Sequence, residues 1–132
     1  MWHPKTNAFE KEMDEVLREV DTELEERYGD RYPLHPARAE HGETASGRHS
    51  GLFSVDAYFT PGYGSELGRG YVVDVEMVTL ADVPDDVEEE IEADAARRVE
   101  AKLQERFPER NFRVSRDGRV FKIRGDFSLG TV

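Results

Sequence analysis

Acidic residues on two neighbouring predicted strands have the spacing closest to that of a chemical site. Asp56 alternates with apolar residues in one segment, and Asp74 and Glu76 alternate with apolar residues in the next. Pairing these strands so that their apolar residues share a face places Asp56 opposite either Asp74 or Glu76. Two carboxylates directly opposite each other destabilise a sheet unless a positive group lies between them. The sequence therefore predicts a positive partner here, which is a basic side chain, a second copy of the chain, or a divalent cation or cationic ligand.

Basic residues of the last predicted hairpin are the first candidates for that partner. Arg113, Lys122 and Arg124 fall on the same face of the sheet as the acids. We expect at least one of them within ion-pair distance of those carboxylates, in the same chain or in a twofold mate. Paired carboxylates also serve glycoside hydrolysis, but a small flat sheet offers little cleft for a sugar. We therefore predict no catalytic residues.

Three histidines lie in the irregular segment 30–50, and together with one glutamate they have the residue types of a metal site. Their separations of six and eight residues match no helical or zinc-finger spacing, so we predict surface histidines and no bound metal. The residues concerned are His35, His41, His49 and Glu43.

A glycine-rich connection, residues 61–70, resembles a phosphate-binding loop in composition. Such loops lead into a helix N-terminus, whereas this one leads into a predicted strand, so the motif is not a phosphate loop. A turn of backbone amides beside Arg69 could still hold an anion. An alternative ligand or enzyme site would lie where this loop meets segment 30–50, with the candidates His35, His41, His49, Arg48 and Arg69.

A tyrosine and two valines interrupt the charged face of the first hairpin. Tyr58, Val72 and Val78 alternate out of phase with the apolar core positions. A tyrosine with two valines among charges is typical of the centre of a protein interface. An RNA-binding sheet would carry several aromatic residues over a basic field, which this face lacks.

The composition excludes several classes of protein chemistry and binding. The chain has 132 residues, a net charge of -11 and no cysteine, so disulfides and thiol catalysis are excluded. Residues 110–132 nevertheless carry six basic and two acidic residues. An acidic body argues against nucleic-acid binding, which requires neutralisation of phosphates. Without a long apolar run or a secretory signal, we expect no membrane association and a cytoplasmic location.

Apolar periodicity predicts the elements that position these residues. Helical spacing covers about 8–28 and 84–107, and alternation covers hairpins at about 51–80 and from 112 onward. Asp117-Gly118 predicts a two-residue type I′ turn in the second hairpin. We expect a single domain over 1–132 of the α+β class, in the order α-β-β-α-β-β. About four antiparallel strands form the sheet, and segment 30–50 is an irregular loop or an edge segment.

Both helices should cover one face of that sheet, because each strand has one apolar face. The opposite face is then left to solvent, a ligand or a second copy. The predicted core consists of Phe53, Val55, Phe59, Val73, Val75, Phe121 and Ile123 beneath Leu17, Val20, Ile91, Val99 and Leu103.

No motif identifies an activity. The pattern favours a small acidic interaction protein without catalysis or cofactor, which forms a homodimer through the open sheet face or a sheet edge. A protein partner other than a second copy stays open, as does the alternative enzyme or ligand site. The candidate binding residues are Asp56, Tyr58, Asp74, Glu76, His49 and Arg69.

Overall fold

The computed structural model describes residues 4–38, 50–60 and 70–125. Two helices and four strands follow one another in the predicted α-β-β-α-β-β order. Their bounds are α1 Pro4–Tyr28, β1 Phe53–Thr60, β2 Gly70–Met77, α2 Asp85–Arg106, β3 Arg113–Asp117 and β4 Val120–Arg124. The strands form one antiparallel sheet in the order β1-β2-β4-β3.

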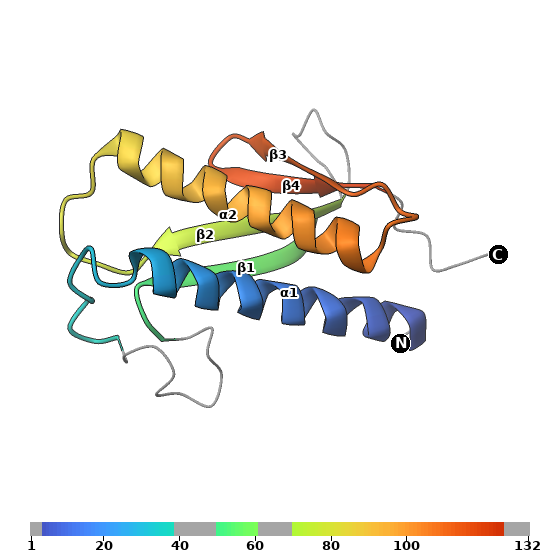
Figure 1. The fold of residues 1–132 in the computed structure, drawn as a ribbon, viewed down its shortest axis with the longest axis horizontal. Helices are drawn as coiled ribbons and strands as arrows, with labels where there is room; N and C mark the ends of the chain where they lie inside the picture. The colour runs from blue at the N-terminus through green and yellow to red at the C-terminus, as the bar shows by residue number, and fades with distance from the viewer. Residues whose placement is uncertain (1–3, 39–49, 61–69, 126–132) are drawn as a thin grey trace.

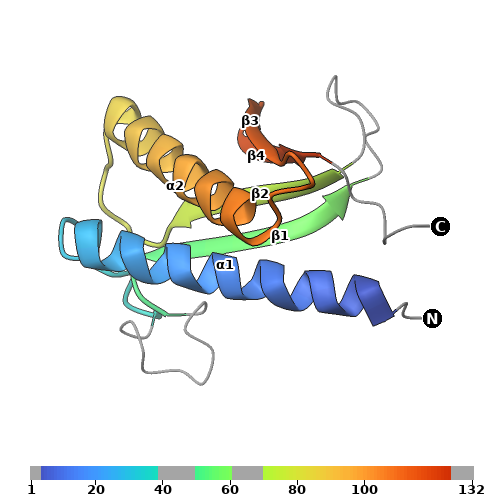
Figure 2. The ribbon, with the colours of Figure 1, turned by 45° about the vertical axis from the view of Figure 1, so that its right-hand side comes forward.

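Both helices pack on the same face of the sheet, as predicted (Figures 1 and 2). Helix α1 runs beside β1, and α2 lies between α1 and the second hairpin. The α+β fold predicted from the apolar periodicity is therefore confirmed. Neither helix has an apolar stretch long enough to cross a membrane in the part of the chain that is described.

A proline marks the start of each helix, and the charges at the ends of α2 match the helix dipole. Helix α1 begins at Pro4, before the predicted start, because proline is well suited to the first turn of a helix. Helix α2 begins directly after Pro84, with acidic residues in its first turn and Arg106 in its last. This charge distribution matches the partial charges at the two helix ends.

The core lies between the helices and the sheet and matches the prediction. The apolar side chains predicted there are buried, with the exception of Phe59, whose side chain lies outside the described part. The buried set includes Leu17, Val20, Phe53, Val55, Val73, Val75, Ile91, Val99, Leu103, Phe121 and Ile123.

The first hairpin takes one of the two predicted registers. Val55 pairs with Val75, so Asp56 lies directly opposite Asp74. The alternative, which pairs Asp56 with Glu76, is excluded. The like-charge pair that the alternation predicted is therefore present in the sheet.

The turn of the second hairpin was predicted wrongly. Asp117 pairs with Val120, so the central turn residues are Gly118 and Arg119. Gly118 has a φ of 67°, and Asn111 is the non-glycine residue with positive φ in the described chain. A positive φ at the first central position only is the pattern of a type II′ turn, not of the predicted type I′ turn.

A contact with α2 explains this shift of the second hairpin. In the observed pairing Arg116 lies opposite Phe121, with its guanidinium 4.6 Å from the centre of that ring. The same guanidinium forms an ion pair with Glu92 of α2, at 3.2 Å. The predicted turn would have placed Val114 opposite Phe121. The shift by two residues preserves which side chains face the helices.

Candidate functional site

The sheet face opposite the helices holds four of the six candidate binding residues. Strand pairing arranges its side chains in rows that cross the sheet. One row contains Asp56 and Asp74, with Glu76 farther along β2. The next row contains Tyr58, Val72, Lys122 and Ser115.

A basic row lies on the other side of this central row. Arg113 pairs with Arg124, and both side chains are exposed. On β3 the sequence of face residues is Arg113, Ser115 and Asp117, so this single strand runs from a base to an acid. Since β2 carries its acids at the same end as Asp117, the face has an acidic end and a basic end.

The acidic and basic ends are too far apart to neutralise each other well. Arg113 and Asp117 are four residues apart on an extended strand, or about 13 Å between their Cα atoms. The ion pair described for the second hairpin joins Arg116 to Glu92 of α2. Ser54 donates a hydrogen bond from its Oγ to Oδ2 of Asp56, at 3.2 Å. The ion pair expected between these acids and Arg113, Lys122 or Arg124 stays a prediction, within one chain or with a twofold mate.

The middle of this face is less open than the sequence predicts. Val72 is only 6% exposed and Lys122 is fully buried, although both helices lie on the opposite face. Tyr58, in the same row, is 51% exposed. The accessible part of the face therefore consists of Tyr58, Ser115 and the two charged ends.

An acidic groove with a volume of about 600 Å³ borders the acidic end of the face. Its walls come from the end of β2, the start of α2 and the turn between β3 and β4. Burial and the neighbouring Glu88 raise the pKa of Glu92, although Arg116 opposes this by donating a hydrogen bond. The groove is lined by Asp74, Val75, Glu76, Met77, Asp85, Glu88, Glu89, Glu92, Arg116, Gly118 and Arg119.

The metal interpretation of the acids gains no support from this geometry. Within residues 4–38, 50–60 and 70–125, no group of three or more histidine or acidic side chains is arranged to hold a metal ion. The positive groups at the groove are the guanidinium of Arg116 and the neighbouring Arg119.

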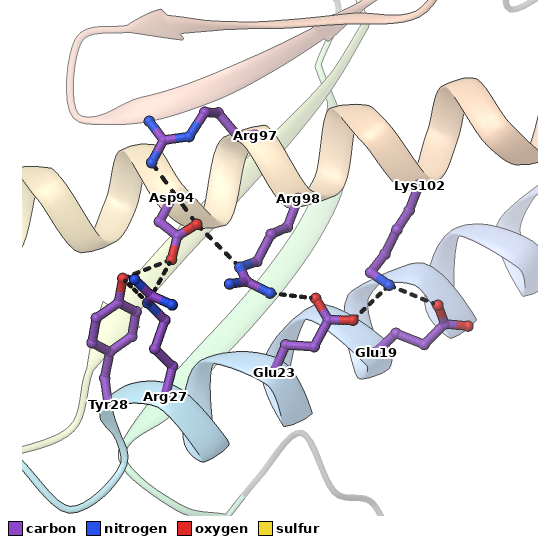
Figure 3. A network of polar contacts seen from close by, with 8 residues as sticks. All are labelled: Glu19, Glu23, Arg27, Tyr28, Asp94, Arg97, Arg98 and Lys102. Atoms are coloured by element: carbon purple, nitrogen blue, oxygen red, sulfur yellow. Dashed lines mark hydrogen bonds and ion pairs between the residues drawn. The ribbon is translucent and has the colours of Figure 1, made fainter.

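A network of polar contacts joins α1 to α2 (Figure 3). Tyr28 donates a hydrogen bond from its hydroxyl to Asp94, at 2.6 Å, and Arg98 donates to the same carboxylate at 3.1 Å. Burial would raise the pKa of Asp94, but the hydrogen bonds from Tyr28 and Arg98 outweigh it and lower that pKa. Burial and the Asp94 hydrogen bond raise the pKa of Tyr28. The tyrosine therefore acts as a hydrogen-bond donor to an ionised carboxylate.

The network continues along both helices. Glu23 accepts from Arg98 and Lys102, both at 2.7 Å, and Lys102 also contacts Glu19 at 3.2 Å. Burial would raise the pKa of Glu23, but these two bases lower it. Glu19 and Glu23 of α1 thus face Arg98 and Lys102 of α2, and these contacts help to hold the two helices together. A spacing of four residues between Arg98, Lys102 and Arg106 is the sequence signal that could have revealed it.

A second set of polar contacts fixes the start of β1. The carboxylate of Glu25 accepts hydrogen bonds from the backbone N–H groups of Leu52, at 3.1 Å, and Phe53, at 2.8 Å. Arg38 donates to the carbonyl oxygens of Gly51, at 3.1 Å, and Phe53, at 3.0 Å. Gly51 has a φ of 79° and lies against the Glu25 carboxylate, where a Cβ atom would collide with it. Sequence reasoning missed both Glu25 and Arg38.

At the opposite edge of the sheet, side chains also form hydrogen bonds with backbone groups. On β3, the backbone N–H of Val114 donates to Glu100 of α2 at 2.9 Å. Gln104 of α2 donates to the carbonyl oxygen of Phe112, at 3.0 Å. Side chains from outside the sheet therefore occupy backbone groups near the start of each edge strand.

The remaining predicted site residues do not form a site in the described structure. His35 lies in a turn, where its Nδ1 accepts from the backbone N–H of Ala37 at 3.0 Å. Its own N–H donates to the carbonyl oxygen of Val78 at 3.0 Å. His41, Glu43, Arg48, His49 and Arg69 lie outside the described residues. The alternative ligand or enzyme site between segments 30–50 and 61–70 stays a prediction.

Comparison with known proteins places this fold in a family. A family model described as "Uncharacterised protein" matches residues 4–125, a range that contains both helices and all four strands. A protein of Borreliella burgdorferi described as "Uncharacterized protein" is 39% identical over 123 residues. That match covers 93% of this chain and 96% of the relative. No solved structure matches the chain.

Proposed function

The chain belongs to the family described as "Uncharacterised protein", and we propose that it is a non-catalytic interaction module that forms a homodimer through the sheet face opposite its helices. The observation that carries the proposal is the charge distribution of this face, which is acidic at one end and basic at the other. Asp56, Asp74 and Glu76 lie at the acidic end, and Arg113 and Arg124 at the basic end.

Such a face is complementary to itself. A twofold axis between two copies can place the acidic end of each face against the basic end of the other. Complementary potentials of this kind fix the orientation of partners and speed their encounter. The exposed helix surfaces are mainly acidic, with Glu26, Glu89 and Glu105 among them, so two copies would repel each other there.

The size of the face predicts a weak dimer. Four strands about 4.8 Å apart, each with five to eight residues of about 3.3 Å, give a patch of roughly 400 Å² before side-chain relief is counted. Stable complexes bury about 800 Å² on each partner. We therefore expect a dimer at micromolar concentration that dissociates as salt rises, because exposed charges are screened.

Charge reversal at one end of the face tests this proposal. The variant Asp74→Lys/Glu76→Lys replaces two acids of the acidic end by bases and keeps Asp56 and Asp117, and Arg113→Glu/Arg124→Glu makes the basic end acidic. Sedimentation equilibrium at low salt should report a dimer for the wild type and a monomer for each variant alone. An equimolar mixture of the two variants should form a heterodimer, because the opposite faces attract each other.

The matched control changes the same number of charges away from the face. Glu105→Lys/Glu109→Lys alters two exposed acids on α2 and the loop that follows it, and should leave the dimer intact. A wild-type mass of one chain, 15.1 kDa, at high protein concentration and low salt would refute the proposal. Failure of the two reversed variants to associate with each other would also refute it.

A further inference from the structure

A groove between α1 and the edge of β1 offers a surface for a partner that is separate from the sheet face. It has a volume of about 260 Å³ and lies where α1 runs along the outer side of β1 (Figures 1 and 2). We propose that this groove binds an extended basic peptide of a partner protein. The peptide adds as a further strand at Ala57 and places a lysine or arginine side chain beneath α1. This peptide site does not depend on the homodimer.

The backbone of Ala57 is directed away from the sheet. At the start of β1, the N–H of Phe53 donates to Glu25 and its carbonyl oxygen accepts from Arg38, so both groups point away from β2. These directions alternate along an antiparallel strand, so Val55 and Ala57 also direct their backbone groups outward. Val55 is fully buried, whereas Ala57 is half-buried and lines the groove. Within the described residues, no hydrogen bond outside the sheet involves Ala57, so its N–H and carbonyl oxygen can pair with an added strand.

The side of α1 that faces this edge carries carboxylates along its length. Glu25 shows the contact directly, because it accepts from the outward N–H of Phe53. Asp14 lies eleven residues earlier, which is three helical turns and about 16 Å along the same side of α1. Ala57 lies four residues after Phe53, or about 13 Å along β1. Since the two elements run antiparallel, Asp14 comes to lie at the groove beside Ala57.

The groove suits one long side chain with a positive end. The side chain of Ala57 is small and packs on the helix side of the sheet. A residue paired with Ala57 directs its own side chain to the same side, and therefore into the groove beneath α1. The aliphatic part of a lysine or arginine can lie against Met13 and Leu17, as such stems do on apolar surfaces. The charged end then reaches the carboxylates of Glu10 and Asp14.

Both of these carboxylates can receive a cation. Glu10 accepts a hydrogen bond from Tyr71, and burial together with this carboxylate raises the pKa of Tyr71. Asp14 contacts Arg18 at 3.1 Å, but both side chains are partly exposed, and an ion pair of this kind is weak. A second copy suits this edge less well, because pairing β1 with β1 would bring the acidic sides of two α1 helices together.

Hydrogen exchange at Ala57 tests the added strand. The probe is the blocked peptide Thr-Val-Lys-Val-Thr, whose β-branched residues favour an extended backbone. At saturating peptide, NMR should show exchange of the Ala57 amide slowed about tenfold, because that N–H becomes hydrogen-bonded. The amide of Tyr58 is the internal control and should not change, because Tyr58 already pairs with Val72 within the sheet.

Charge variants test the acidic side of the groove. Glu10→Gln/Asp14→Asn keeps the size of both side chains and should weaken binding of the lysine peptide about tenfold. Glu26→Gln/Asp30→Asn makes the same two chemical changes at exposed positions and should bind as the wild type does. The peptide Thr-Val-Glu-Val-Thr should bind at least about tenfold more weakly than the lysine peptide, because its charge is repelled.

Slower exchange at Ala57 together with loss of binding in Glu10→Gln/Asp14→Asn supports the inference. Binding without protection of Ala57, equal binding of the two peptides, or no binding at millimolar peptide overturns it. Slow exchange at Ala57 without peptide also overturns it. An effect that grows with protein concentration would then show a second copy at this edge, and a constant effect would show that the chain itself occupies the edge. The homodimer is judged separately, by sedimentation.

Discussion

Replacing Glu25 by glutamine should destabilise the protein by about 2 kcal/mol, although glutamine has the same size and a similar helix propensity. The two carboxylate oxygens of Glu25 accept from the N–H groups of Leu52 and Phe53, residues with no solvent exposure. Glutamine offers one acceptor oxygen and an NH2 group that only donates. One buried N–H must then face another donor.

The size of the effect follows from that loss. A hydrogen bond to a charged group contributes about 1.5–3 kcal/mol to stability, and a buried N–H left without an acceptor costs about 1–3 kcal/mol. These two figures describe the same lost interaction, so they are not added. Glu25 is only half-buried, so water can relieve part of the cost, and about 2 kcal/mol is the central expectation. Glu25→Ala removes both acceptors and should cost about twice as much.

Urea unfolding followed by circular dichroism measures this difference. Glu26→Gln is the matched control, because Glu26 is the exposed neighbour on the same helix and undergoes the same chemical change. We expect the control to lie within about 0.5 kcal/mol of the wild type, as surface substitutions usually do. If Glu25→Gln is as stable as Glu26→Gln, the two hydrogen bonds do not hold the start of β1 and the reasoning fails.

Three other predictions concern stability. Ile123→Ala should lower the free energy of unfolding by about 2–4 kcal/mol through lost burial and a cavity, and equal urea midpoints for variant and wild type would contradict the predicted core. Tyr28→Phe should cost about 1–2 kcal/mol, because it removes the 2.6 Å hydrogen bond to Asp94, and the cost should be smaller in an Asp94→Ala background, which lacks the acceptor. The folded state holds the pKa of Asp94 below its ordinary 3.8, so the stabilisation is complete above that value and is lost as the pH falls through the lower folded pKa. Urea titrations from neutral to strongly acidic pH should therefore show a smaller loss of stability for Asp94→Asn than for the wild type.

The sequence predicted the sheet well because strand alternation is a local signal. Phe53, Val55, Val73 and Val75 identify the buried face without knowledge of their partners, and two registers remained for the first hairpin. The second hairpin was misplaced by two residues, because the predicted and observed pairings bury the same faces. The contact of Arg116 with Phe121 and α2 distinguishes them, and it joins residues that are not neighbours in the chain.

Of the candidate site, the sequence could predict the residues on the strands but not the contacts made by helix and loop residues. The opposition of Asp56 and Asp74 follows from alternation alone. Glu25 could not be found, because in the sequence it is one of many acids on a long helix that all resemble a solvated surface. Its role depends on Gly51 and its neighbours, which approach the helix only in the folded chain. Arg38 lies in an irregular segment with no periodicity to place it.

The occupied backbone groups at both sheet edges limit how far association can proceed. An exposed strand edge accepts another strand, whose far edge accepts the next, and the result is an open-ended ribbon or fibril. In this protein Glu25 and Arg38 bind backbone groups at the start of β1, and Glu100 and Gln104 bind those of Val114 and Phe112 at the start of β3. A symmetric face-to-face contact buries the sheet face of both copies, so no such face is left to bind a third copy. Substitution of Glu100 and Gln104 by alanine should therefore favour insoluble polymers over larger discrete oligomers, which turbidity and electron microscopy would detect.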